Sequence, residues 1–105
     1  PNLERRLVLF ADDIEIEDPA GLARGSGRAG MEEFFRSTFD NGVIINRKPI
    51  ERIVVGNEAI ERSAMTLEKE GLEPHPLAHV VHYTFDDQGL IRRMRVFFDM
   101  ESIFR

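Results

Sequence analysis

A short run of alternating acidic and apolar residues near the start of the chain ends in a carboxylate that could do chemistry. In this run Ile14 and Ile16 point to one face of a predicted strand, and the acids that alternate with them, at positions 13, 15 and 17, point to the other. Asp18 shares the parity of the isoleucines, so its carboxylate is expected on the apolar side, and Pro19 ends the strand. Such an acid is either a turn-forming aspartate before proline or a carboxylate in a pocket.

Two further polar residues bracket Val81 on a later predicted strand. His79 and Tyr83 stand two positions to either side of it, so the three side chains should share a face. Tyr83 could donate its phenol hydrogen to a developing oxyanion, or it caps the core with its hydroxyl at the rim. His79 could act as an acid or donor opposite Asp18, because histidine titrates near neutrality, or it is a satisfied core or surface group.

The remaining titratable residues on these strands indicate no metal site. His82 has the opposite parity to His79, and His75 lies in a proline-flanked turn, so three ring nitrogens do not reach one side of a strand. Glu61 has inner parity near the start of its strand and is a possible second pocket acid. We expect neither a metal ion nor another cofactor.

The elements that must position these groups are mainly strands. An amphipathic helix is predicted over residues 28–39, with its apolar stripe on one side, and a shorter helix over residues 2–10. Glycines and turn signals separate the predicted strands, which cover residues 13–18, 43–55, 58–68, 77–85 and 90–98. The four long strands are joined by hairpins, so they predict a twisted antiparallel meander with the aromatic helix face on its concave side.

Strand parity also predicts what lines the concave side. The predicted pocket residues are Ile14, Ile16, Phe34, Phe35, Ser63, Met65, Leu67, Val81, Met94, Val96 and Phe98. The opposite face carries Phe97, Ala64 and Val80 among charges, a mixture that suits either a dimer interface or solvent.

Composition limits the class of protein. The 105 residues predict one domain, residues 1–105, and the net charge of −5 with scattered basic residues argues against a nucleic-acid partner. The sequence contains neither an apolar run of membrane-spanning length nor a recognisable signal peptide, so a cytoplasmic location and no membrane partner are expected. With no cysteine, disulfides and thiolate chemistry are excluded.

Several motifs together resemble a known family, the ketosteroid isomerases. They belong to the nuclear transport factor two-like superfamily, which also contains the SnoaL-type polyketide cyclases. The motifs that carry the resemblance are Asp12-Asp13 with Glu17-Asp18-Pro19, Gly27-x-x-Gly30-Met31-x-x-Phe34-Phe35, Val55-Gly56-Asn57-Glu58-Ala59, His82-Tyr83-x-Phe85 with Asp87-x-Gly89, and Met94-Arg95.

The resemblance implies a conical α+β fold in which a curved antiparallel sheet wraps around helices and encloses an apolar pocket, commonly in a homodimer. It also implies a further helix N-terminal to residue 1, which this chain would lack. Asp18 falls where these isomerases keep the base that moves a proton between two carbons of a conjugated ketone. Val81 stands where they place a protonated aspartic acid, and Phe35 where they place a supporting tyrosine.

Three functions follow from the residues and the resemblance. The first is allylic isomerisation of a small apolar, steroid- or polyketide-like carbonyl compound, with Asp18 as base. The second is a SnoaL-like cyclase or hydrolase that uses Asp18 with His79 or Tyr83. The third is a cone domain that binds a small ligand without catalysis.

Overall fold

The computed structural model describes residues 8–40 and 42–99, with the backbone alone for residues 38–40. The strands are β1 (Phe10–Glu17), β2 (Ala23–Ser26), β3 (Ile44–Val55), β4 (Glu58–Glu68), β5 (His75–Phe85) and β6 (Ile91–Phe98), and the helix is α2 (Gly27–Asp40). Among the described residues no helix is long and apolar enough to cross a membrane.

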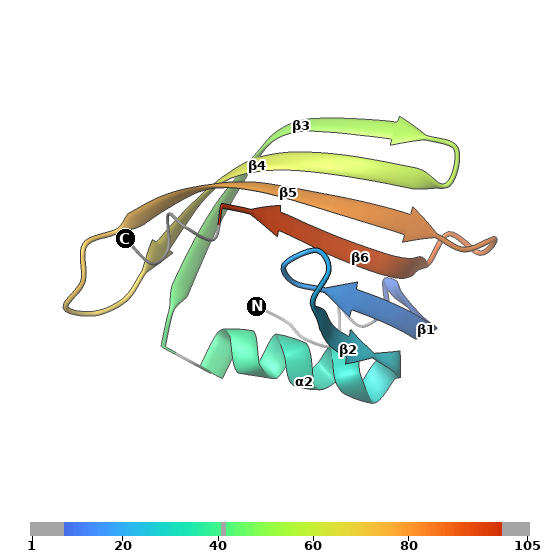
Figure 1. Cartoon of the computed structure of the whole chain (residues 1–105), viewed down its shortest axis with the longest axis horizontal. Coiled ribbons are helices and arrows are strands. Elements are labelled where there is room, and N and C mark those ends of the chain that lie inside the picture. The colour runs from blue at the N-terminus through green and yellow to red at the C-terminus, as the bar shows by residue number, and fades with distance from the viewer. Residues whose placement is uncertain (1–7, 41, 100–105) are drawn as a thin grey trace.

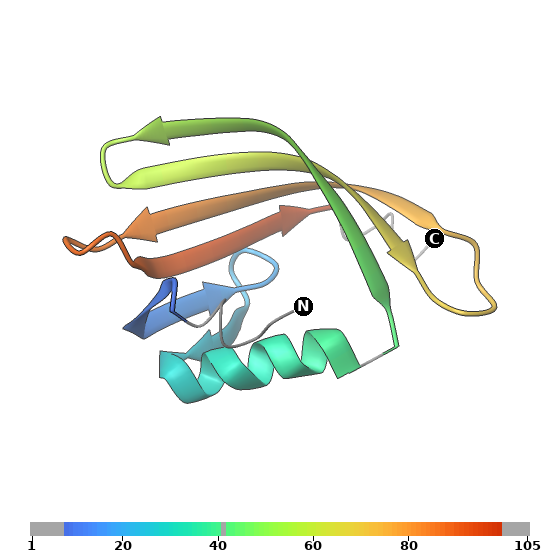
Figure 2. The same cartoon turned by 180° about the vertical axis from the view of Figure 1, so that it is seen from behind.

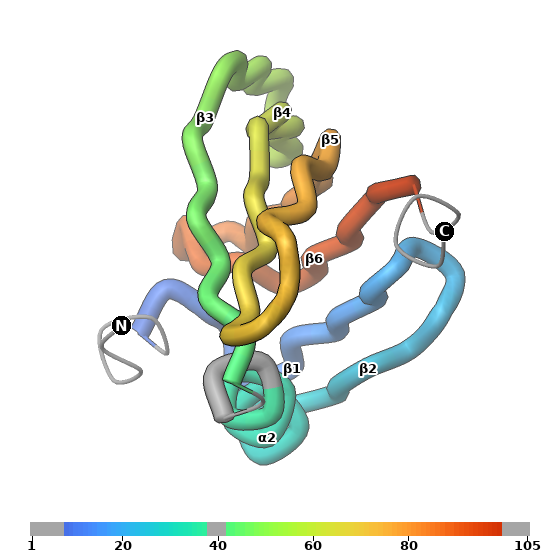
Figure 3. Tube along the Cα trace, turned by 90° about the vertical axis from the view of Figure 1, so that its left-hand side faces the viewer, coloured from blue at the N-terminus to red at the C-terminus, as the bar shows by residue number. Residues whose placement is uncertain are grey.

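The six strands form one curved sheet in the order β2-β1-β6-β5-β4-β3. Consecutive strands from β3 to β6 pair as antiparallel hairpins, as predicted. The sheet arches over α2, which lies along its concave side (Figures 1 and 2). An end-on view shows β6 and β1 turning away from the direction of β3 to β5, so that the sheet bends around the helix (Figure 3). The predicted α+β fold with a curved sheet is therefore confirmed.

The first strand differs from its prediction in extent and in pairing. It begins at Phe10, where a helix was expected to end, and stops at Glu17. Val8 and Leu9, which were also expected in that helix, form a turn, and residues 2–7 lie outside the described residues. β1 pairs in parallel with β6, with Phe10 opposite Ile91, so the sheet is not antiparallel throughout. Phe10 is buried because this pairing carries its ring into the core.

A short strand also lies between the first predicted strand and the predicted helix, where the sequence predicted no strand. β2 pairs antiparallel with β1 and places Ser26 opposite Glu15. Its side chains are mostly exposed, so it has no alternation of apolar and polar residues to reveal it. β2 then runs into α2 at close range, because a Cβ atom at Gly25 would lie 2.8 Å from the carbonyl oxygen of Gly30. Glycine at position 25 permits this approach.

The third correction concerns the start of β5. His75 was expected in a solvated turn, but it is the first residue of the strand, is partly buried, and pairs with Leu67 of β4. The cross-strand ladder extends past Pro76, which is possible because the described pairing of β5 with β6 reaches only to His79, so Pro76 lies where β5 is paired on one side.

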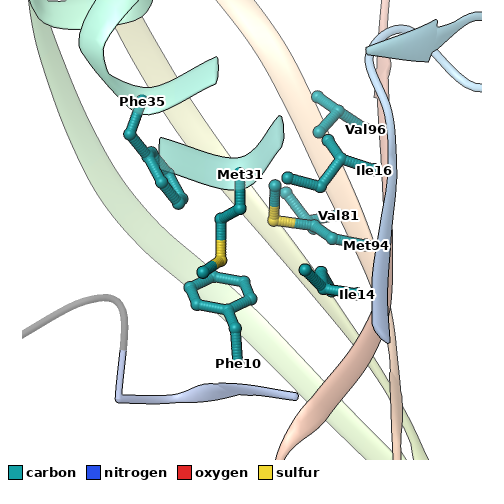
Figure 4. Close-up of a cluster of buried hydrophobic side chains, with 8 residues drawn as sticks. All are labelled: Phe10, Ile14, Ile16, Met31, Phe35, Val81, Met94 and Val96. Carbon is teal, nitrogen blue, oxygen red and sulfur yellow. The ribbon is translucent and has the colours of Figure 1, made fainter. Parts of the chain in front are cut away.

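The core lies between α2 and the β1, β6 and β5 part of the sheet. The phenyl rings of Phe10 and Phe35 pack with their centroids 5.6 Å apart, and Met31 is fully buried in the same cluster. Figure 4 shows the whole buried cluster, which comprises Phe10, Ile14, Ile16, Met31, Phe35, Val81, Met94 and Val96.

Candidate functional site

Asp18 lies one residue beyond the end of β1, in a loop held by backbone hydrogen bonds. Its amide donates to the carbonyl of Leu22 at 3.0 Å, and the Arg24 guanidinium Nε donates to the Asp18 carbonyl at 2.8 Å. The amide of Ala20 donates to the carbonyl of Val96 at 2.7 Å. The loop is therefore fixed against β6. The predicted strand included Asp18, but the observed strand ends one residue earlier, at Glu17.

The carboxyl group of Asp18 is partly buried, and this changes its acidity. Burial raises the pKa of Asp18 above its ordinary value, while the positive charge of Arg24 lowers it to a smaller extent. The neighbouring acid behaves differently: hydrogen bonds from Arg93 and from the Gly21 amide lower the pKa of Glu17. Of these two adjacent acids, Asp18 is the stronger base.

Asp18 leads onto a row of side chains that crosses the concave face. The loop that carries Asp18 is bound to β6 through the hydrogen bond from the Ala20 amide to the Val96 carbonyl. Val96 pairs with Val81, and Val81 pairs with Glu61. Two carboxylates thus stand at the two ends of an apolar row, three strands apart.

His79 and Tyr83 flank this row on β5. Their parity places them on the face of the buried Val81, as predicted. Tyr83 is partly buried and packs against the core, with its ring centroid 6.3 Å from that of Phe85. His79 is buried, and burial followed by the charge of Arg47 lowers its pKa, so the imidazole is neutral at neutral pH. No hydrogen bond within the described part of the chain joins either side chain to Asp18.

Glu61 is more deeply buried than its position near a strand end indicated, with 3% of its surface exposed. Arg47 and Arg52 of β3 both reach it: Arg47 Nη2 lies 3.1 Å from Oε1, and Arg52 Nε donates to Oε2 at 3.0 Å. These arginines are five positions apart, so in a regular strand they would point to opposite faces. The register shift between Pro49 and Glu51 brings both to the same carboxylate.

The predicted pocket residues lie on the concave side, but in two environments. Eight of them pack in or against the core cluster: Ile14, Ile16, Phe34, Phe35, Val81, Met94, Val96 and Phe98. Ser63 and Met65 are buried on β4 beyond that cluster, and Leu67 is partly buried. Their role toward a ligand stays a prediction. No group of three metal-binding side chains that could hold an ion occurs among the residues described.

The convex face of the sheet is apolar near its centre. A hollow of about 460 Å³ is lined by Ile60, Val80, His82 and Phe97. The imidazole Nε2 of His82 lies 2.8 Å from the carboxylate of Glu58 at its edge. Ile60 and Phe97 expose 45% and 40% of their surfaces there, which is unusual for large apolar residues on one patch.

Comparison with known proteins gives one family and a consistent fold. Residues 1–94 match the family model described as the SnoaL-like domain. The epoxide hydrolase/cyclase-like enzyme SalBIII, which acts in pyran ring formation in the polyether salinomycin, is 25% identical, with a TM-score of 0.79 over 96% of this chain and 81% of that chain.

Two mycobacterial structures share the fold at lower identity. A Mycobacterium tuberculosis protein in complex with estradiol-17β-hemisuccinate is 24% identical, with a TM-score of 0.79 over 94% of this chain and 82% of that chain. The Δ5-3-ketosteroid isomerase of a Mycobacterium species is 23% identical, with a TM-score of 0.76 over the same shares of the two chains, 94% and 82%.

Proposed function

Because the chain belongs to the SnoaL-like domain family, we propose that it is an enzyme that moves a proton within a small apolar carbonyl compound, with Asp18 as general base. The observation that carries the proposal is the position of the Asp18 carboxyl, which is partly buried in a loop bound to β6; this burial raises its pKa. A carboxylate in such an environment is a stronger base than one in water, and general bases work best when their pKa approaches the working pH.

The reaction is an allylic isomerisation. The Asp18 carboxylate takes a proton from the carbon between a ketone and a β,γ double bond, and the electron pair that is left delocalises onto the ketone oxygen. The resulting carboxylic acid returns the proton to the γ carbon, so the double bond moves into conjugation and Asp18 is regenerated. The phenol of Tyr83 is the proposed hydrogen-bond donor to the oxyanion, because the side chain of Val81, which lies between Tyr83 and His79, has no hydrogen-bond donor.

The apolar surroundings of the row define the substrate class. The side chains between Asp18 and Glu61 are Val96 and Val81, which offer no polar partner to a substrate. A steroid- or polyketide-like skeleton suits such a surface because it gains by leaving water.

A panel of β,γ-unsaturated ketones tests the proposal through the ultraviolet absorbance of the conjugated product. Asp18→Asn should lower the rate by roughly two to four orders of magnitude, the usual contribution of a general base. Asp13→Asn is the matched control, since Asp13 is an exposed acid of β1. Equal activity, or equal inactivity, of the wild type and Asp18→Asn across the panel would overturn the proposal.

A second candidate is favoured by the neutral, buried His79 and by the likeness to SalBIII. In this alternative Asp18 acts with His79 or Tyr83 in epoxide opening, either by water or by an internal hydroxyl that closes a ring. His79→Ala should then abolish turnover of an epoxide substrate, whereas it should leave ketone isomerisation largely intact.

The third candidate is a pocket that binds an apolar ligand without turnover. It predicts thermal stabilisation by the ligand that Asp18→Asn preserves or increases, because the variant removes a partly buried charge.

A further inference from the structure

Ser63 and His79 form a buried polar pair that the proposed proton transfer does not use. They are direct cross-strand partners on β4 and β5, and both lie on the concave face. Ser63 exposes 2% of its surface and His79 7%, yet Ser63 Oγ and His79 Nδ1 have no hydrogen-bond partner in the described structure. Buried polar atoms are nearly always hydrogen-bonded, so two orphans on one cross-strand pair point to a missing partner.

The neighbours of the pair along the strands are apolar on one side and include a buried acid on the other. Met65 and Leu77, the next inward-facing pair on one side, are both buried. On the other side the next inward-facing pair is Glu61 with Val81, and both are buried as well. A molecule that reached the pair would therefore meet two hydrogen-bonding groups between an apolar pair and the ion-paired Glu61.

A cluster of three charged side chains adjoins the pair. Arg47 pairs with Met65 on one side of Ser63, and its guanidinium reaches Glu61 on the other side. Arg52 also binds Glu61, so the three side chains together carry one positive charge in excess. Of the three, Arg47 and Glu61 act electrostatically on His79, and they do so in opposite senses.

We propose that Ser63 and His79 bind a carboxylate oxygen of an otherwise apolar ligand, with the positive charge of Arg47 opposite it. The Ser63 hydroxyl donates one hydrogen bond, and the imidazole donates a second from Nδ1, which fixes the tautomer. Hydrogen bonds to an ionised acceptor are stronger than those to a neutral one, so a carboxylate fits two donors and a cation better than a ketone does.

The distance to Asp18 sets the size of this ligand. β1 and β5 are separated by β6, and two strand spacings together with the two-residue offset along β5 give about 12 Å between the two positions. A ligand that touches both sites is therefore the size of a fused-ring skeleton with an acid at its far end. This size estimate rests on the proposed role of Asp18, whereas the carboxylate subsite does not.

Two fluorescent probes that differ in one group test the subsite: 1-pyrenebutyric acid and 1-pyrenebutanol. The wild type should bind the acid at least about tenfold more tightly than the alcohol, as expected for hydrogen bonds to a charged group. Ser63→Ala and His79→Leu should each weaken binding of the acid by about tenfold and leave that of the alcohol unchanged. Ser63→Ala removes only an unpartnered hydroxyl, so its thermal midpoint should not fall.

Arg47→Met should lower affinity for the acid in the same selective way. Lys48→Met is the matched control, since Lys48 is an exposed cation next to Arg47 whose side chain has the opposite parity. Equal affinity for the two probes, absence of acid binding, or equal weakening of both probes by Ser63→Ala would overturn the proposal.

The Asp18→Asn variant separates this inference from the proposed function. If the variant loses isomerisation but keeps the preference for the acid, both proposals stand. If the wild type isomerises ketones but binds the acid no more tightly than the alcohol, the subsite alone is overturned. A preference without isomerisation in the wild type would overturn the proposed activity alone.

Discussion

The amide of Ala20 donates a 2.7 Å hydrogen bond to the carbonyl of Val96 and ties the loop after β1 to the last strand. The same loop is closed by the bond from the Asp18 amide to the Leu22 carbonyl. Both bonds involve main-chain atoms, so the position of Asp18 does not depend on its own carboxylate. Substitutions of this side chain can therefore change its chemistry without releasing the loop.

Asp18→Asn should raise stability at neutral pH. Burial raises the folded-state pKa of Asp18 above its ordinary value of 3.8, so the folded state resists ionisation more than the unfolded chain does. The ionised group therefore costs stability once the pH exceeds 3.8, and the full cost is present above the folded-state pKa. Thermal unfolding at pH 7 should show a higher midpoint for Asp18→Asn, and the gain should vanish below pH 3.8.

Asp13→Asn serves as the control for that comparison, because Asp13 is an exposed acid on β1. An Asp18→Asn variant that is no more stable than Asp13→Asn at neutral pH would contradict the assignment of a partly buried carboxylate.

Gly25→Ala should destabilise the fold by about 1–3 kcal/mol, the usual cost of forcing an extra carbon into a packed site. The new Cβ would lie 2.8 Å from the carbonyl oxygen of Gly30, and a backbone atom cannot rotate away as a side chain can. Urea unfolding measures the change. Ala29→Ser, at an exposed position of α2, should stay within about 0.5 kcal/mol of the wild type. A Gly25→Ala protein as stable as that control would show that β2 and α2 can separate freely.

Local sequence signals were sufficient for the long hairpins. Gly56 and Asn57 mark the turn between β3 and β4, and the predicted strand 58–68 matches β4 at both ends. The parallel pairing of β1 with β6 joins segments about 80 positions apart, such as Phe10 and Ile91, and no local pattern encodes such a pairing. β2 was missed because its exposed side chains show no alternation of apolar and polar residues.

The candidate site was predictable to the extent that it depends on parity. Parity placed His79, Val81 and Tyr83 on one face, because regular strands alternate. It could not pair Arg47 and Arg52 with one carboxylate, because the irregularity between Pro49 and Glu51 reverses the alternation of β3. Pro49 lies at this irregularity, and only the observed register shows which face each arginine takes.

The double variant Arg47→Met/Arg52→Met should be destabilised by about 3 kcal/mol, because it leaves a buried carboxylate without a partner. Glu61 is almost fully buried, whereas the side chains of Arg47 and Arg52 are 39% and 67% exposed. The cost therefore arises from Glu61, and adding Glu61→Leu should recover most of the lost stability. Denaturant unfolding of the three proteins forms the test, and a triple variant no more stable than the double variant would contradict it.

The convex face should form the interface of a homodimer. Ile53, Val55, Ile60 and Phe97 expose 54%, 71%, 45% and 40% of their surfaces there. The same face carries opposite charges side by side, such as Glu51 and Arg62, so two copies related by a twofold axis can pair them across the contact.

Phe97→Lys should convert the dimer to a monomer in sedimentation experiments, because it places a charge at the centre of the apolar hollow. Phe97→Leu is the conservative control and should remain a dimer. A wild type that sediments as a monomer at every concentration would rule out this use of the face.

Acidification should destabilise the protein through His79. Burial and the charge of Arg47 lower the folded-state pKa of His79 below its ordinary value of 6.5, so the unfolded chain holds more protons between the two values. Stability therefore rises with pH through that window and is lost as the pH falls, with a slope of at most about 1.4 kcal/mol per pH unit for one proton.

His79→Leu should flatten the profile of unfolding free energy below pH 6.5. Arg47→Met should also flatten this profile. Without the positive charge of Arg47, the folded-state pKa of His79 moves back toward 6.5, and the charge of Glu61 continues to raise it. Parallel profiles for the wild type and His79→Leu would mean that the imidazole titrates equally in the folded and unfolded states.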